Sequence, residues 1–179
     1  QAWYQGGLSV FDFTDSAHPK EIAYFDRGPI NGEQMLSGGY WSTYWYNGNL
    51  YGSEMARAID VFRLKPSEFL SQNEIDAATQ FRLQEFNSQN QPKVVWEPTA
   101  AVAKAYMDQL NRSKSITAAQ MKTVNDALSK ADGRSKAAVD QLETLAGQFD
   151  AEAGKTSGVD QKRSKALAET LRGRAARLR

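Results

Sequence analysis

Three ionisable residues lie three positions apart in the middle of the chain: Glu54, Arg57 and Asp60. Two carboxylates beside one guanidinium can hold a polar ligand or an ion. The same three groups can instead pair with one another and secure a strand crossing. We therefore predict that Glu54, Arg57 and Asp60 belong to a ligand-binding surface, with internal ion pairing as the other interpretation.

The stretch just before these residues is unusually rich in aromatic side chains, with Trp41, Tyr44, Trp45 and Tyr46 close together. In a β-strand, side chains alternate between the two faces, so Trp41 and Trp45 are expected on one face and Tyr44 and Tyr46 on the other. One face must pack inside the protein, and the other can present rings on which a sugar or a peptide stacks. These four residues complete the predicted ligand-binding set, with core packing as the alternative.

The residue types that support catalysis by metals or thiols are scarce. The chain has no cysteine, which excludes disulfides, iron–sulfur clusters and thiolate zinc sites. Its one histidine, His18, precedes Pro19 and is expected in a turn between strands. No phosphate-binding loop, dinucleotide fingerprint or nucleophile elbow is present in the sequence. We predict no catalytic residue, no metal ligand and no cofactor.

The elements that position the candidate residues are short strands. Asn47-Gly48 supplies the positive φ angles of a tight hairpin turn, which predicts strands at 41–46 and 49–54. A third strand is expected at 58–64, completing an antiparallel meander. Two earlier strands are expected at 7–13 and 21–25.

The strand patterns at 7–13 and 58–64 match each other. Gly-Leu-Ser-Val-Phe-Asp-Phe and Ala-Ile-Asp-Val-Phe-Arg-Leu share small, apolar, polar, Val, Phe, charged and apolar residues, 51 positions apart. That offset is close to the ~40–50 residues of a propeller blade. The segment 7–25 resembles an LVIVD repeat, a β-propeller repeat of secreted and surface-associated bacterial proteins. The segment 39–62 resembles the last blade of such proteins.

This resemblance, which covers about residues 1–98, implies a fold and an extracellular or cell-surface location, and it implies no catalytic residues. Fewer than two blades are present, whereas a propeller closes a ring of about four to eight. The expected partners are therefore the remaining blades, supplied by upstream sequence or by another chain. A protein or a cell-surface polymer is a further expected partner.

From Thr99 the apolar spacing becomes helical, and four amphipathic segments predict an antiparallel bundle. Thr117 and Gln120 fit a capping box at the start of the second helix. Before the bundle, a short helical turn with a serine cap is expected at 66–70, and a second short helix is expected at 73–78 with Asn73 as its cap. The predicted fold is therefore a multi-domain β + α chain: partial propeller blades at 1–65, short helices and a linker at 66–98, and a helical bundle at 99–179.

Net charge is +1, made of −5 in residues 1–98 and +6 in residues 99–179. The last helix is basic; its cations either contact an anionic polymer or membrane surface or lie on a solvated face. No apolar run approaches the ~20 residues of a membrane helix. We expect no membrane span and no nucleic-acid partner.

The leading functional prediction is a non-enzymatic extracellular binding or interaction module, with the aromatic residues and Glu54, Arg57 and Asp60 as its recognition surface. One alternative is the C-terminal part of a propeller hydrolase or lyase whose catalytic groups lie in further blades. Another is a structural subunit that assembles by strand pairing.

Overall fold

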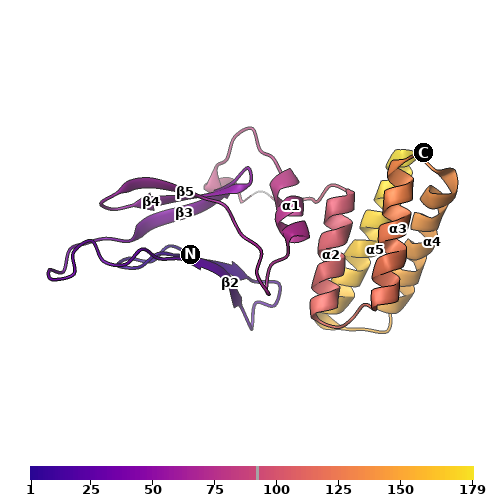
Figure 1. The fold of residues 1–179 in the computed structure, drawn as a ribbon, viewed down its shortest axis with the longest axis horizontal. Helices are drawn as coiled ribbons and strands as arrows, with labels where there is room; N and C mark the ends of the chain where they lie inside the picture. Colours follow the sequence, from indigo (N-terminus) through magenta and orange to yellow (C-terminus); the bar gives the residue numbers. More distant parts are fainter. Residues whose placement is uncertain (92) are drawn as a thin grey trace. The chain divides into compact units, whose positions relative to one another are not determined.

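The computed structural model describes residues 1–91 and 93–179. The chain forms two compact units. The first contains residues 1–70 and 78–93 and is mainly β-structure; the second contains residues 71–77 and 94–179 and is helical (Figure 1). Each unit is described by itself below.

The β unit contains two small antiparallel sheets. One is the hairpin β1–β2, and the other has the order β3–β4–β5, as the predicted meander requires. Figure 1 shows the two sheets as two layers within this unit. The strands are β1 (Leu8–Asp12), β2 (Lys20–Phe25), β3 (Tyr40–Tyr46), β4 (Asn49–Glu54) and β5 (Ala58–Phe62).

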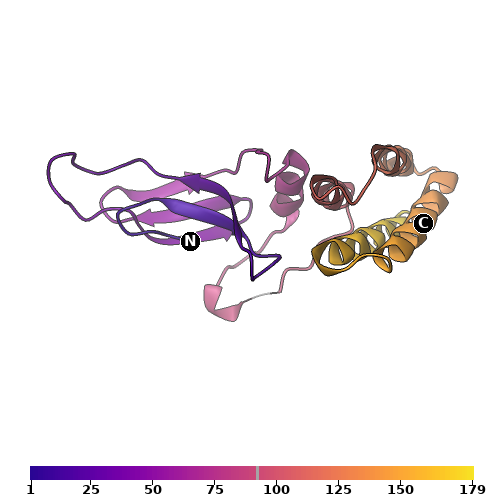
Figure 2. The same cartoon turned by 90° about the horizontal axis from the view of Figure 1, so that it is seen from below.

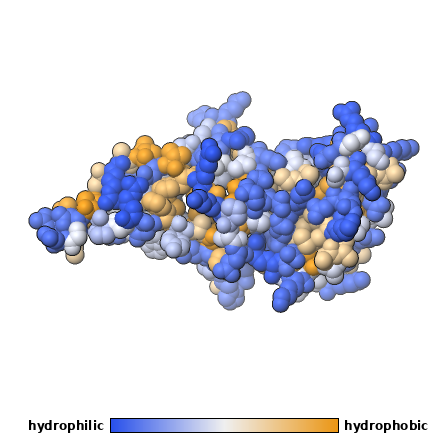
Figure 3. All heavy atoms as spheres, in the orientation of Figure 1, coloured by the Kyte–Doolittle hydropathy of each residue, from blue (hydrophilic) through white to orange (hydrophobic). Residues whose placement is uncertain are grey.

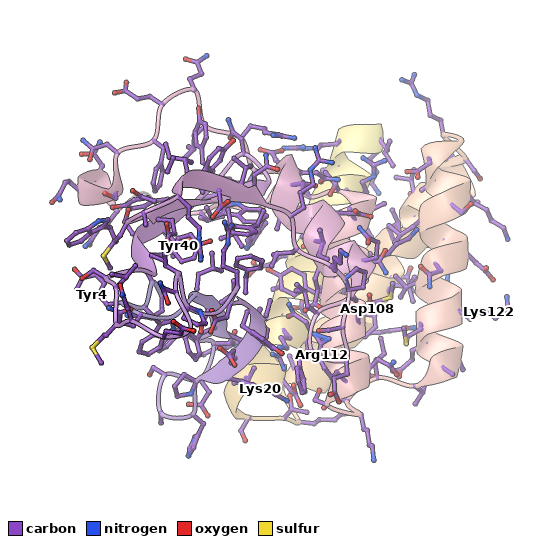
Figure 4. All side chains as sticks on the ribbon, turned by 60° about the vertical axis from the view of Figure 1, so that its left-hand side comes forward. Tyr4, Lys20, Tyr40, Asp108, Arg112 and Lys122 are labelled. Carbon is purple, nitrogen blue, oxygen red and sulfur yellow. The ribbon has the colours of Figure 1, made fainter. Side chains whose placement is uncertain are left out.

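Aromatic rings connect the two sheets. The Phe25 ring of β2 lies 4.5 Å from the Phe62 ring of β5, measured between ring centres, and Tyr40 meets Phe62 edge-on at 6.1 Å. Tyr40 is only 1% exposed because its ring lies over Gly52, where a side chain would occupy the same space. Figure 4 shows Tyr40 inside the β unit.

The hairpin turn between β3 and β4 is formed by Asn47 and Gly48, as predicted. Their φ angles of 48° and 89° are both positive, as a type I′ turn needs. The Asn47 side chain has a second role. Its Nδ2 donates to the Leu83 carbonyl at 3.0 Å, and its Oδ1 accepts the Leu83 N–H at 2.8 Å. The turn therefore anchors a distant segment of the chain.

Asn47→Gly separates these two roles, because glycine keeps the positive φ and lacks the amide. Two hydrogen bonds of about 1 kcal/mol each are lost, so the Leu83 N–H is expected to exchange with solvent at least about tenfold faster. Amide hydrogen exchange measures this. Asn31→Gly is the control, because the hydrogen bonds that the Asn31 side chain accepts from Glu33 and Gln34 lie within its own loop. An unchanged Leu83 rate in Asn47→Gly would show that the amide does not hold the segment.

The region after β5 differs from the prediction. A short helix was expected at 66–70, but Ser67 and Leu70 instead exchange backbone hydrogen bonds of 2.8 and 3.4 Å without helical structure. The helix α1 (Gln72–Gln80) begins after Ser71, which caps it. Ser71 Oγ accepts the Glu74 N–H at 3.2 Å and Glu74 Oε2 accepts the Ser71 N–H at 2.6 Å. This reciprocal pair replaces the cap expected at Asn73.

The helical unit is built from four longer helices with short connections, as the apolar spacing predicted. They are α2 (Ala100–Arg112), α3 (Ala118–Asp132), α4 (Lys136–Ala153) and α5 (Gly158–Leu178). α5 packs against α4 and α2, and α4 packs against α3. Figure 2 views these helices close to end-on. Their apolar faces form one core in which Leu110, Leu142, Leu167 and Leu171 are fully buried.

The predicted capping box at the start of α3 is confirmed. Thr117 Oγ1 accepts the Gln120 N–H at 3.2 Å, and the Gln120 side chain accepts the Thr117 N–H at 2.8 Å. The preceding residue, Ile116, is buried in the bundle core.

The chain is thus a β + α protein with two antiparallel sheets and five α-helices in the described residues. Those residues contain no closed barrel and no closed propeller ring. The domain boundaries at 65 and 98 stay a prediction. Between residues 70 and 94 the chain passes from the β unit to the helical unit, back to the β unit and again to the helical unit.

Candidate functional site

The aromatic candidates on β3 differ in their exposure. Trp41 is 59% exposed and Tyr44 is 45% exposed, whereas Trp45 and Tyr46 are half-buried. A register shift between Tyr40 and Ser42 interrupts the alternation that placed Trp41 and Trp45 on one face. As a result Tyr40 is the aromatic residue buried over Gly52, and the Trp41 ring contacts the Tyr4 ring at 5.3 Å between ring centres.

The other face of β3 is partly covered by the segment after α1. The Phe86 ring contacts the rings of Tyr44 and Tyr46 at 6.0 and 6.2 Å between ring centres. The Tyr46 hydroxyl also donates to the Leu83 carbonyl at 3.2 Å. Residues 82–86 therefore form a strap over this face, and Tyr44 remains the more accessible of the two tyrosines.

Glu54 is buried, and backbone N–H groups surround its carboxylate. One oxygen accepts from Gly39 at 3.1 Å, and the other accepts from Ala56 at 2.8 Å and from Arg57. Burial acts to raise the pKa of Glu54, but these backbone hydrogen bonds outweigh it and lower the pKa below its ordinary value. The carboxylate holds the turn between β4 and β5 together.

Asp60 is also engaged within the unit. It accepts a hydrogen bond from the Tyr40 hydroxyl at 2.6 Å and pairs with the Arg27 guanidinium at 2.6 Å. The hydrogen bond from Tyr40, followed by the contact with Arg27, holds the pKa of Asp60 below its ordinary value. Arg27 lies in the loop after β2, so this triad ties that loop to both β3 and β5.

Arg57 is not paired with Asp60 as one interpretation expected. Its guanidinium donates to the Pro29 carbonyl at 3.3 Å. Beside it, Gly38, Gly39 and Glu54 line a cavity of about 10 Å³, which is about the space of one water molecule. The three charged candidates thus lie in one region of the β unit, where they join loops to strands. Their role in ligand binding stays a prediction.

The Tyr40–Asp60 hydrogen bond gives the β unit a defined pH dependence. Burial, and then the hydrogen bond to Asp60, raises the pKa of Tyr40 to about 12 from an ordinary value of about 10. A raised pKa means that the contribution is complete below pH ~10 and is lost as pH rises through ~12. We expect the unfolding free energy of the β unit to fall over that window.

Tyr40→Phe removes this titration and a hydrogen bond to a charged group, at a cost of about 1.5–3 kcal/mol at pH 7. Denaturant unfolding followed by tryptophan fluorescence at several pH values measures both effects. The control is Tyr24→Phe, because Tyr24 is 77% exposed. If the unfolding free energy of Tyr40→Phe fell above pH ~10 as steeply as that of the parent protein, the contacts of Tyr40, Asp60 and Arg27 would not be the cause of this pH dependence.

Sequence reasoning did not single out the exposed face of β5. Ile59 is 70% exposed and Val61 is 58% exposed, although both are aliphatic strand residues. Their neighbours Asp60 and Phe62 contact Arg27 of the loop after β2 and the Phe25 ring of β2. The signal was present in the strand pattern, since alternation puts Ile59 and Val61 on one face and the Asp60–Phe62 pair on the other.

A larger groove of about 730 Å³ lies within the β unit. Residues of both sheets and of the segment 63–69 line it. Lys20, labelled in Figure 4, lies with its ammonium 3.7 Å from the centre of the Phe69 ring, beside this segment. The apolar lining of the groove includes Leu8, Val10, Ile22, Leu50, Phe62 and Phe69.

The basic residues of α5 are largely matched by carboxylates of the same unit. Arg172 pairs with Asp150 and Arg174 with Asp132, both at 2.5 Å. Arg177 pairs with Glu97. Arg179 lies 2.8 Å from Glu143 and 3.2 Å from Asp140. These pairs reduce the charge that the end of α5 could offer to an anionic surface.

His18 lies in the turn before β2, as predicted, with its Nδ1 3.0 Å from Asp15 Oδ2. Within residues 1–91 and 93–179, no group of three or more histidine, cysteine or acidic side chains is arranged to hold a metal ion. Among the described helices, none is both long and apolar enough to cross a membrane. Comparison with models of known families, with curated proteins and with solved structures finds no match for this chain.

Proposed function

We propose that this chain is a non-enzymatic interaction module whose β unit is the last part of an LVIVD-type β-propeller located outside the cytoplasm. The observation that carries the proposal is the open edge of the β3–β4–β5 sheet. β5 ends the sheet, and Ile59 and Val61 on it expose most of their side-chain surface. A terminal strand that lies beside an exposed apolar face is a template for pairing with another strand.

The contact between the two sheets supports a propeller rather than an isolated sheet. A three-stranded meander faces a hairpin through Phe25, Tyr40 and Phe62, which is how consecutive blades would share an apolar interface. The resemblance of segments 7–25 and 39–62 to LVIVD repeats supports the same assignment and the extracellular location. The remaining blades then come from upstream sequence or from another chain.

The accessible rings define the recognition surface within this proposal. The carboxylate oxygens of Glu54 and Asp60 accept hydrogen bonds from the unit itself, so ligand contact falls mainly to Trp41 and Tyr44. Exposed aromatic rings offer large contact area to a protein or a cell-surface polymer. The helical bundle would serve as a separate docking or capping element.

The size of the native polypeptide tests the proposal. We expect an antibody against the helical bundle to detect, in the extracellular or surface fraction of the source cells, a polypeptide or a stable complex well above 19.9 kDa. We also expect the β5 amides to exchange slowly in that native material and rapidly in the isolated chain. A cytoplasmic 19.9 kDa monomer with equally fast exchange at β5 would contradict the proposal.

A further inference from the structure

We infer that the open edge of β5 binds an extended peptide strand in which alternating apolar residues are flanked by carboxylates. This inference rests on the proposed interaction function and specifies the chemistry of its partner. It combines three features of β5: an unpaired edge, an apolar outer face and two exposed cationic residues that directly follow the strand.

The edge is available for strand addition. β5 pairs with β4 on one side and is the last strand of its sheet. Soluble proteins commonly protect such an edge with lysine, proline or a charge that repels an incoming strand. The strand Ala58–Phe62 contains neither lysine nor proline. Its one charged residue, Asp60, is paired with Arg27 and accepts a hydrogen bond from the Tyr40 hydroxyl.

The outer face offers apolar contact beside that edge. Ile59 and Val61 lie two residues apart on this face, next to Ser53 and Tyr51 of β4. Figure 3 shows a hydrophobic patch on the surface over β4 and β5. A partner strand with apolar residues at alternate positions would place them next to Ile59 and Val61.

The charges that follow the edge are positive, because Arg63 and Lys65 come after β5 and are exposed. Asp60, the carboxylate within β5, is paired inward with Arg27 and does not balance them at the surface. Arg57, before β5, is turned toward the loop after β2, where its guanidinium donates to the Pro29 carbonyl at 3.3 Å. A partner with a carboxylate at each end of its apolar stretch would place one of them beside Arg63 and Lys65 in either strand direction.

The same charges argue against a second copy of β5 as the partner. Asp60 is the one carboxylate in residues 58–65, and it is paired inward with Arg27. A second β5 strand would therefore bring no unpaired carboxylate to Arg63 and Lys65, and it would add further cations beside them.

Fluorescence anisotropy with synthetic peptides tests the inference on the full chain. The probe is a labelled peptide of Val and Thr in alternation with Glu at each end, and the matched probe carries Lys in place of Glu. We expect the Glu-flanked probe to bind at least about tenfold more tightly. A third probe with proline in the middle should not bind, because proline removes a donor needed for strand pairing.

Two substitutions locate the site. Val61→Lys removes an apolar contact from the outer face of β5, so it should weaken binding of the Glu-flanked probe. Met35→Lys adds the same charge at a 97% exposed loop position and should leave the affinity for this probe unchanged. Arg63→Glu should reverse the preference so that the Lys-flanked probe binds more tightly. Circular dichroism and tryptophan fluorescence confirm that each variant remains folded.

Equal affinity for both charged probes, or binding that is insensitive to Val61→Lys and Arg63→Glu, would overturn the inference. Concentration-dependent self-association abolished by Val61→Lys would overturn it in favour of a second copy. These outcomes are separate from the proposed function, because the size and location of the native polypeptide do not depend on which peptide the edge accepts.

Discussion

Gly39→Ala is expected to destabilise the β unit by about 3 kcal/mol or more, enough to unfold a large share of a marginally stable unit. Gly39 has a φ of +85°, a conformation that L-residues rarely adopt. An added Cβ would also lie 2.5 Å from the Trp3 carbonyl oxygen and 2.6 Å from the Gln5 nitrogen. Those atoms are backbone and cannot rotate away.

The position matters because Gly39 lies where the N-terminal segment crosses to the second sheet. Tyr4 and Gly39 form an isolated β-bridge, and the Tyr40 N–H donates to the Trp3 carbonyl at 3.1 Å. The Gly39 N–H donates to Glu54, and its carbonyl accepts from Met55 at 3.0 Å. Displacing this residue would therefore disturb the N-terminal segment, β3 and the β4–β5 turn together.

Urea unfolding of the full chain measures the effect, because Trp3, Trp41 and Trp45 report on the β unit by fluorescence. The matched control is Gly32→Ala, where no atom lies within 4 Å of the added Cβ. We expect the control to stay within about 0.5 kcal/mol of the parent. Similar losses in the two variants would show that close backbone contact at Gly39 does not limit stability.

Leu142→Ala is expected to destabilise the helical bundle by about 3–5 kcal/mol. The Leu142 side chain is fully buried on α4, within the core that α2, α3, α4 and α5 share. Its truncation removes apolar contacts and leaves a cavity that rigid helices can fill only in part. Thermal unfolding followed by helical circular dichroism should show a clear fall in the transition temperature.

Two controls separate the cavity from the substitution itself. Leu142→Met conserves volume and should cost less than about 1.5 kcal/mol. Leu36→Ala removes the same atoms from a side chain that is 44% exposed, and we expect it to change bundle stability by less than about 0.5 kcal/mol. A Leu142→Ala loss no larger than that of Leu142→Met would mean that the core refills the space.

The helical half of the chain was the more predictable from its residues. Helix starts depend on groups three residues apart, so Thr117 and Gln120 could be paired from the sequence and are paired in the structure. The Asn47-Gly48 turn was predictable for the same local reason. The cap of α1 was misplaced at Asn73 because Ser71 and Glu74 offer a reciprocal pair that the residue pattern did not single out.

The surroundings of the candidate site depended on contacts between residues far apart in sequence. Nothing near Asp60 in the chain indicates that Arg27 and Tyr40 bind its carboxylate. The register shift at the start of β3, which buries Tyr40 in place of Trp41, is likewise a property of strand pairing. The first depends on where the loop after β2 meets the three-stranded sheet, and the second on how β3 pairs with β4.

The candidate cluster and aromatic strand were therefore visible in the residues alone, together with the meander, the bundle and the absence of cysteine chemistry. These features follow from composition and from interactions within a few positions, which the chain order states directly. The tertiary structure alone showed that Glu54 and Asp60 are held by their own unit and that Ile59 and Val61 are left exposed on an open edge. Those outcomes depend on which strands meet and in what register, and a one-dimensional pattern does not contain that information.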